Sequence, residues 1–373
     1  MRKGTVLYVG GFILPDKNAA AQRVVTIAKI LRDIGYQVVF LNRSPYADNP
    51  EWRETSYFGF RCFEQKRTGK KELIKRLVDI EYIKGYAEKF SDLAAIIAYN
   101  FPAVALKKLN SYCRSNNIKC IGDVTEWYGI KYGSIAYRIA KGVDSFYRMR
   151  IQHKRLSGNI VISDFLEEYY SRSTKVVNLP PLVDKKDQKW MCSMEGHEGI
   201  QFIYAGSPGR EKERLDLIVG AILELREKYD VKLMIIGVTQ EQFMEMYSWN
   251  NREIDTRCIC FLGKIPHKQV IKYVSEADYS ILIRDRNRVT TAGFPTKFAE
   301  SISCGTPVLA NNNSCIFKYF KNGKNGIPIS ESRLRADLED VLNRSQKPEV
   351  QKDIFDYRNY IEPLRKFMED CNA

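Results

Sequence analysis

The amino-acid sequence predicts an α/β protein of two domains, each a mostly parallel sheet with helices on both faces. Three observations support this. Short apolar segments typical of buried strands alternate with segments whose apolar residues recur at helical spacing. This alternation begins again after Pro180-Pro181. The chain has 373 residues, which is more than one domain usually contains.

The first domain opens with a strand–helix–strand unit. Residues 5–11 are a short apolar run that ends in two glycines, residues 20–35 have helical periodicity, and residues 38–41 are the next strand. Further strands are expected at 94–98, 118–122, 159–162 and 175–179, and helices at 103–115 and 164–170.

The second domain repeats this plan. Strands are expected at 201–205, 231–236, 259–262, 279–283 and 307–310, and helices at 215–229, 267–276 and 296–303. The prolines and the polar stretch 184–199 predict the boundary. We therefore expect domains at 1–183 and 184–350, followed by a C-terminal helix within 351–373 that packs back on the first domain. In such folds ligands bind beyond the carboxyl ends of the strands.

Composition excludes several classes of protein. With 44% hydrophobic and 28% charged residues the chain is neither disordered nor collagen-like. No apolar run approaches the length of a membrane span, and the first residues lack a secretory signal pattern, so we expect a cytoplasmic protein. Nine scattered cysteines without a CxxC pair are expected to be reduced thiols.

The positive charge is confined to the first half. Residues 1–190 hold 33 Lys and Arg against 19 Asp and Glu, which accounts for the whole net charge of +14. Residues 66–89 and 131–155 mix basic with apolar and aromatic residues at helical spacing. They fit either helices that hold the protein peripherally on an anionic membrane or solvated helix faces that pack their apolar sides inside. No nucleic-acid recognition motif accompanies the charge.

The segment 284–313 has the highest density of candidate site residues. Arg284, Arg286 and Arg288 lie in a polar loop that leads through Gly293-Phe-Pro-Thr-Lys297 into a helix, with Glu300 one turn inside it. A helix start and a lysine attract phosphate, and a carboxylate can accept both hydroxyls of a ribose. Alternatively, Pro295 only marks the helix start and Glu300 is a solvated helix residue.

The run GFPTKFAESISCGTPVLA resembles the C-terminal signature of retaining glycosyltransferases of the GT4 type, the glycosyl transferases group 1. Two other stretches are similar to this family in order and spacing, residues 204–216 and residues 261–278. Residues 161–163 and 179–184 resemble its domain-crossing segment.

The resemblance implies the GT-B fold, in which two Rossmann-like domains face a central cleft. It further implies that Glu300 holds the nucleotide ribose and that Lys212 neutralises the donor diphosphate. The remaining donor-binding residues would be Gly206, Gly209 and Arg210 in the diphosphate loop and Gly293, Phe294, Pro295, Thr296 and Lys297 around the transferred sugar and phosphates.

Two positions depart from the family pattern. The glutamate often found seven residues before Glu300 is Ala292 here, so a sugar contact is missing or moved. The arginine often found after the first loop glycine is Ser207, so Arg210 or one of the arginines at 284, 286 and 288 would supply that charge. Arg284 is nearest to a strand end and is the preferred catalytic candidate.

In the first domain, Gly10 and Gly11 end the first strand, where they permit a tight turn or a close approach to the donor phosphate. Glu126 follows the strand at 118–122 and is either a catalytic carboxylate that binds the acceptor or a structural cap. A histidine that family members often have near this loop is replaced by Thr125, and His153 lies elsewhere.

The sequence therefore predicts a retaining glycosyltransferase that moves a sugar from a nucleotide-diphosphate-sugar donor to a hydroxyl of a glycan or lipid-linked glycan, in cell-surface polysaccharide synthesis. Only three histidines are present and none is in a metal-binding pattern, so neither a metal nor another cofactor is expected. A sugar-nucleotide epimerase of GT-B architecture, or a non-catalytic basic adaptor, remains the alternative.

Overall fold

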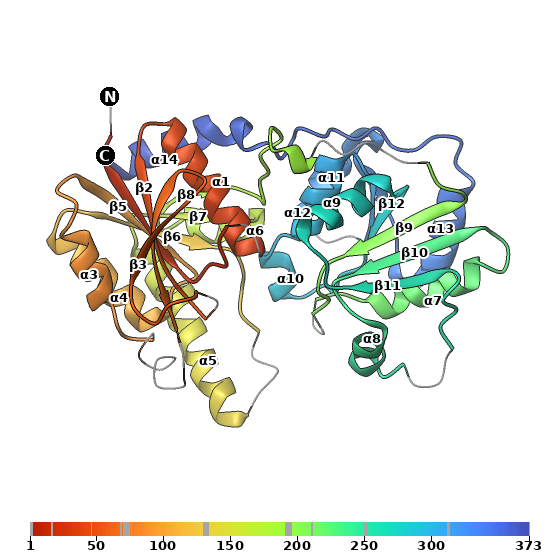
Figure 1. The fold of residues 1–373 in the computed structure, drawn as a ribbon, viewed down its shortest axis with the longest axis horizontal. Coiled ribbons are helices and arrows are strands. Elements are labelled where there is room, and N and C mark those ends of the chain that lie inside the picture. Colours follow the sequence, from red (N-terminus) through yellow and green to blue (C-terminus); the bar gives the residue numbers. More distant parts are fainter. Residues whose placement is uncertain are drawn as a thin grey trace. The chain divides into compact units, whose positions relative to one another are not determined.

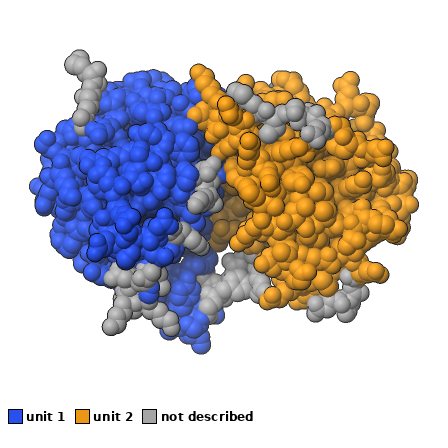
Figure 2. Space-filling model, viewed as in Figure 1, with its two compact units in different colours: residues 1–182, 357–373 blue, residues 183–356 orange. Residues whose placement is uncertain are grey.

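The computed structural model forms two compact units, residues 1–182 with 357–373 and residues 183–356 (Figure 2). The first unit thus includes the C-terminal segment of the chain as well as its N-terminal half. The structure describes residues 3–15, 18–45, 47–67, 69, 75, 77–129, 134–190, 196–209, 212–249, 253–311 and 314–372.

The first unit is built on an eight-stranded sheet in the order β3-β4-β2-β1-β5-β6-β7-β8 (Figure 1). All neighbouring strands are parallel except β3 and β4, which form an antiparallel pair at one edge. The strands are β1 (Thr5–Gly10), β2 (Gln37–Ser44), β3 (Arg53–Tyr57), β4 (Phe60–Lys66), β5 (Leu93–Tyr99), β6 (Lys119–Val124), β7 (Gly158–Val161) and β8 (Lys175–Asn178).

Strand β1 is buried on both faces because helices cover both sides of the sheet. Val6 and Tyr8 pack into one apolar cluster with α1 and α14, and Leu7 and Val9 into a second with α3 and α4. The helices are α1 (Ala19–Asp33), α3 (Glu81–Ala87), α4 (Ala103–Ser115), α5 (Ile135–Tyr147), α6 (Asp164–Ser171) and α14 (Ile361–Asn372). A π-helical turn (Arg148–Gln152) and a 3-10 turn (His153–Arg155) follow α5 directly.

The C-terminal helix α14 packs against α1 and β8. Its close approach requires a glycine in β7, since a Cβ at Gly158 would lie 2.7 Å from Cys371 Sγ and from the Phe367 ring. The last helix therefore belongs to the core of the first unit.

The second unit has a six-stranded, fully parallel sheet in the order β11-β10-β9-β12-β13-β14. Its strands are β9 (Ile200–Ala205), β10 (Val231–Ile236), β11 (Ile259–Gly263), β12 (Tyr279–Leu282), β13 (Val308–Ala310) and β14 (Gly326–Pro328). Its helices are α7 (Leu215–Leu225), α8 (Gln240–Tyr247), α9 (His267–Glu276), α10 (Arg288–Ala292), α11 (Thr296–Cys304), α12 (Ser314–Phe317) and α13 (Leu334–Leu342). Short 3-10 turns occur at Gln188–Trp190, Lys318–Gly323, Glu331–Arg333 and, in the first unit, Tyr357–Tyr360.

Each sheet reverses its strand order beside its first strand. In the first unit β2 and β5 flank β1, and in the second unit β10 and β12 flank β9. Crossover connections leave in opposite directions at such a point, so the loops after the two central strands separate and open a place for a ligand. The candidate ligand-binding loops are therefore those after β9 and β12 in the second unit and those after β1 and β5 in the first unit.

The predicted fold class is confirmed: both units are doubly wound, Rossmann-like α/β domains. The structure adds the β3–β4 pair and β14. It corrects the helix expected at 215–229, which ends at Leu225 and is followed by a turn in which the N–H groups of Lys228 and Tyr229 both bond the Leu225 carbonyl, each at 3.0 Å. No described helix is both long and apolar enough to cross a membrane.

Candidate functional site

The loop after β9 packs tightly at the carboxyl edge of the second sheet. Gly206 has φ +148, and a Cβ there would lie 2.8 Å from Cε of Lys297. A Cβ at Gly237, which follows β10, would lie 2.6 Å from the Gly206 backbone. Glycine is therefore required at both positions by close approach, and the start of the loop is fixed between β10 and α11.

Beneath this loop lies a buried polar cluster. The Lys297 ammonium donates to the Tyr204 hydroxyl at 2.9 Å and lies 2.5 Å from Oε2 of Glu213. The Tyr204 hydroxyl also donates to the same carboxylate oxygen. All three side chains are buried. They come from β9, the loop after it and α11, so the cluster ties the signature helix to the first strand of the sheet.

Burial and ion pairing shift the pKa values of Glu213 and Lys297 in opposite directions. Burial alone raises the pKa of Glu213, but Lys297, the hydroxyl of Tyr204 and Arg284 outweigh it and hold that pKa below its usual range. Burial together with Arg284 lowers the pKa of Lys297 despite the nearby carboxylate. Burial and Glu213 raise the pKa of Tyr204 well above its usual value. Glu213 is therefore ionised and Tyr204 keeps its proton.

Arg284 lies in the loop just after the end of β12, and it is 5% exposed. Its backbone forms an antiparallel bridge with Glu213, and its N–H donates to the Asn311 amide oxygen at 2.9 Å. Its guanidinium donates to the Thr290 carbonyl at 3.4 Å, whereas its Nε has no hydrogen-bond partner among the residues that the structure describes. Arg286 and Arg288, in contrast, are exposed.

Lys212 links the two loops through its backbone. Its N–H donates to the Gly209 carbonyl at 2.8 Å, and its own carbonyl accepts from the Asp285 N–H at 3.3 Å. The Lys212 side chain is partly exposed, unlike that of Lys297. Arg210, the other predicted loop cation, lies outside the described residues.

Glu300 lies one turn after Lys297 on α11 and is partly exposed. Its Oε1 lies 3.1 Å from Nε2 of His267, the first residue of α9. The Trp190 ring meets the His267 ring edge-on at 6.3 Å. Position 267 was expected only as the start of a helix, and the contact of His267 with Glu300 was not predicted.

The residues that lead into α11 differ in what they can offer a ligand. Phe294 is buried and meets the rings of Phe298, Tyr319 and Phe355 edge-on at about 6 Å, so only its backbone is available to a ligand. Gly293 closes α10, Pro295 occupies the N-cap of α11, and Thr296 at the first position of α11 is partly exposed. Ala292, at the departure from the family pattern, is fully buried.

In the first unit, Gly10 and Gly11 have a packing reason to be glycine. A Cβ at Gly10 would lie 2.7 Å from the Phe12 ring, and one at Gly11 would lie 3.0 Å from the Arg43 carbonyl. The Phe12 N–H donates to the Asn42 side chain at 2.9 Å. The turn after β1 is thus tight, which is one of the two roles expected for these glycines.

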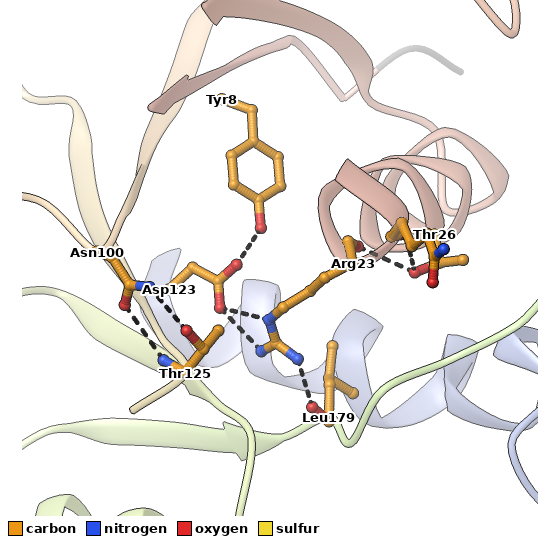
Figure 3. Close-up of polar contacts among 8 residues, drawn as sticks. Tyr8, Arg23, Thr26, Asn100, Asp123, Thr125 and Leu179 are labelled. Carbon is orange, nitrogen blue, oxygen red and sulfur yellow. Dashed lines mark hydrogen bonds and ion pairs between the residues drawn. The ribbon is translucent and has the colours of Figure 1, made fainter. Parts of the chain in front are cut away.

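A buried ion pair supports the carboxyl edge of the first sheet (Figure 3). Asp123 accepts from Arg23 at 2.8 Å and from the Tyr8 hydroxyl at 2.5 Å, and Arg23 also donates to the Leu179 carbonyl at 2.7 Å. Asp123 is fully buried, and burial with this carboxylate raises the pKa of Tyr8 well above its usual value. The carboxylate of Asp123 is thus engaged within the fold by Arg23 and Tyr8.

The residues after Asp123 are held by a second set of contacts. Thr125 and Asn100 bond each other, with Asn100 Nδ2 2.7 Å from the Thr125 hydroxyl (Figure 3). Tyr128 lies under the Arg148 guanidinium, 4.0 Å from ring centroid to Cζ. Glu126 is partly exposed between them. Arg148 was predicted only as part of the basic stretch 131–155 and not as a residue of this site. It is buried after α5, and its guanidinium also donates to the Asn100 carbonyl at 3.3 Å.

Two further features bear on the site. A cavity of about 880 Å³ lies between α7 and α13, lined among others by Tyr247 and Glu331, and none of the predicted donor-site residues lines it. Among the residues described, no group of three or more His, Cys, Asp or Glu side chains is arranged to hold a metal ion.

Comparisons with known proteins agree with this arrangement. Residues 195–354 match the family model described as glycosyl transferases group 1. The fold is similar to that of a sucrose-phosphate synthase from Thermosynechococcus elongatus, with a TM-score of 0.67 and 14% identity over 99% of this chain and 93% of that one. Anabaena HepE in complex with UDP and glucose is similar at a TM-score of 0.67 and 13% identity, over 98% of this chain and 99% of that one. A comparison with curated protein sequences found no match.

The fold and the site together define a protein of GT-B architecture. The match of residues 195–354 to the group 1 model lies within the second unit, so the resemblance that the signature around Glu300 indicated is confirmed.

Proposed function

We propose that the protein is a retaining glycosyltransferase that moves a sugar from a nucleotide-diphosphate-sugar donor to a hydroxyl of a glycan or lipid-linked glycan. The observation that carries the proposal is the convergence of Lys212, Arg284 and the glycine loop at the strand reversal of the domain that matches the group 1 family. The complex of HepE with UDP and glucose supports a nucleotide-sugar donor.

The donor diphosphate would be held by the loop that contains Gly206 and Gly209. Arg284 has a buried Nε without a partner among the described residues, and a phosphate oxygen would satisfy it. Lys212 adds a partly exposed positive charge on the same connection. Because charge develops on the diphosphate as it leaves, these cations stabilise the transition state more than the ground state.

Glu300 would accept hydrogen bonds from the ribose hydroxyls, with His267 fixing the orientation of its carboxylate. Lys297 was expected near the transferred sugar and phosphates, but we propose a different role for it. Its ammonium is paired with Glu213 below Gly206, so we propose that it supports the loop from beneath rather than contacting the sugar.

Transfer would follow a front-face route. The bond from the anomeric carbon to the diphosphate oxygen breaks, the acceptor oxygen bonds the same face of that carbon, and the acceptor proton passes to the departing phosphate oxygen. We assign acceptor binding to the basic first unit, with Glu126 as a hydroxyl-binding carboxylate. A cell-surface polysaccharide would be the product.

The proposed reaction needs no metal, since Lys212 and Arg284 supply the positive charge. Addition of EDTA should leave turnover unchanged. Complete loss of activity that Mg²⁺ or Mn²⁺ restores would contradict the metal-free route.

A thermal-shift panel of UDP, GDP, ADP and their sugars tests the proposal as a whole. A ligand at 100 times its Kd stabilises a protein by about 2.7 kcal/mol, so one nucleotide series should raise the melting temperature clearly above the others. Failure of every nucleotide at millimolar concentration would contradict the proposal.

A further inference from the structure

Helix α5 (Ile135–Tyr147) differs from the other helices of the first unit in its exposed apolar side chains. Figure 1 shows it projecting from the body of that unit. Ile135, Ile139, Val143 and Phe146 are 76%, 62%, 64% and 56% exposed. The only buried residue that α5 contributes is Ser145.

These four residues form one stripe, whereas Tyr137, which is 54% exposed, lies on another side of the helix. At about 100° per residue their positions fall within an arc of about 80° on the helix surface. The opposite side attaches α5 to its unit: Asp144 accepts from the Ala103 N–H at 2.7 Å and lies 3.3 Å from Arg148. The stripe therefore faces away from the contacts that hold the helix.

The surroundings of the stripe are positively charged. Residues 134–155 contain six Lys or Arg and a single acidic residue, Asp144, which is engaged as described. Arg138 and Arg150 are exposed beside the stripe, and the Arg150 guanidinium lies 5.2 Å from the Phe146 ring centroid. Arg148 does not belong to this surface, because it is buried against Tyr128.

We propose that α5 docks the protein on an anionic lipid bilayer, with the stripe inserted among the lipid chains and Arg138 and Arg150 at the phosphate level. An apolar stripe bordered by cations is the pattern that binds such an interface. A second copy of this chain would bring like charges together, which disfavours self-association through this face. The proposal goes beyond the proposed function and does not depend on it.

Co-sedimentation of the full chain with vesicles tests the proposal. The protein should pellet with phosphatidylglycerol vesicles at low salt, less at high salt, and little with neutral phosphatidylcholine. Arg138→Gln with Arg150→Gln should weaken the low-salt partition by about fivefold per charge, which corresponds to about 1 kcal/mol each. Ile139→Gln with Val143→Gln should weaken it at both salt concentrations.

Matched controls lie elsewhere on the first unit. Arg172→Gln removes an exposed charge from the end of α6, and Phe58→Gln removes a 44% exposed apolar side chain. Both should pellet like the wild type, and all variants should keep the wild-type circular dichroism and nucleotide affinity. Nucleotide affinity reports on the proposed function separately.

Three outcomes would overturn the proposal. They are negligible pelleting of the wild type, equal pelleting of the stripe variant and the wild type, and loss in the stripe variants of a dimer that the wild type forms without vesicles.

Discussion

The ammonium of Lys297 lies 2.5 Å from the carboxylate of Glu213, although 84 residues separate them along the chain. The pair joins the loop after β9 to the helix that carries Glu300. Lys297 Cε also fills the space that a Cβ at Gly206 would occupy. The ion pair therefore fixes how closely the glycine loop approaches α11. The proposed diphosphate site thus depends on a buried ion pair that does not itself bind the ligand.

This relationship predicts a large effect of Glu213→Gln on stability. The change leaves the Lys297 ammonium buried without its countercharge, which should cost about 3–5 kcal/mol of unfolding free energy. The double variant Glu213→Gln with Lys297→Met should recover much of that loss, because no charge then remains buried. Urea unfolding of the two single variants and the double variant gives the coupling energy, and additive effects would show that the pair does not act as a unit.

Lys212 should matter for turnover more than for binding. Lys212→Ala removes a charge whose benefit is greatest as the diphosphate leaves, so kcat should fall by more than the nucleotide Kd rises. Lys228→Ala is a suitable control, since that exposed lysine lies beyond the end of α7. Wild-type kcat in a folded Lys212→Ala protein would remove Lys212 from catalysis.

His153 should make the stability depend on pH. Burial and the charge of Arg148 lower its pKa from 6.5 to about 3, and its Nδ1 lies 2.9 Å from the Asn159 side chain. Between pH 6.5 and about pH 3, His153 is protonated in the unfolded chain but neutral in the folded chain. The free energy of unfolding therefore decreases as the pH is lowered through this range, by up to about 1.4 kcal/mol per pH unit.

The contribution of His153 can be isolated by chemical denaturation between pH 7 and pH 5. His153→Gln should flatten the dependence of the unfolding free energy on pH relative to the wild type. An identical slope in His153→Gln and the wild type would show that His153 titrates alike in both states.

The fold was predictable because its central strands are continuous apolar runs between helical patterns. Strand β3, RETSY, was missed because its polar residues lie exposed at the sheet edge and carry no burial signal. The candidate loops were predictable because the signature around Glu300 is local in the sequence. Partnerships over long separations were not: nothing local pairs Glu213 with Lys297 or Arg23 with Asp123, and these depend on how the strands assemble.

The central claim is that a nucleoside diphosphate binds the second unit through Glu300. Calorimetric titration of the best nucleotide into the wild type, Glu300→Ala and Glu362→Gln tests it most directly, the last being a control at an exposed glutamate of α14. We expect Glu300→Ala to weaken binding by about 1.5–3 kcal/mol for each charge-assisted bond lost, and the control to bind like the wild type. Wild-type affinity in a folded Glu300→Ala protein would contradict the account.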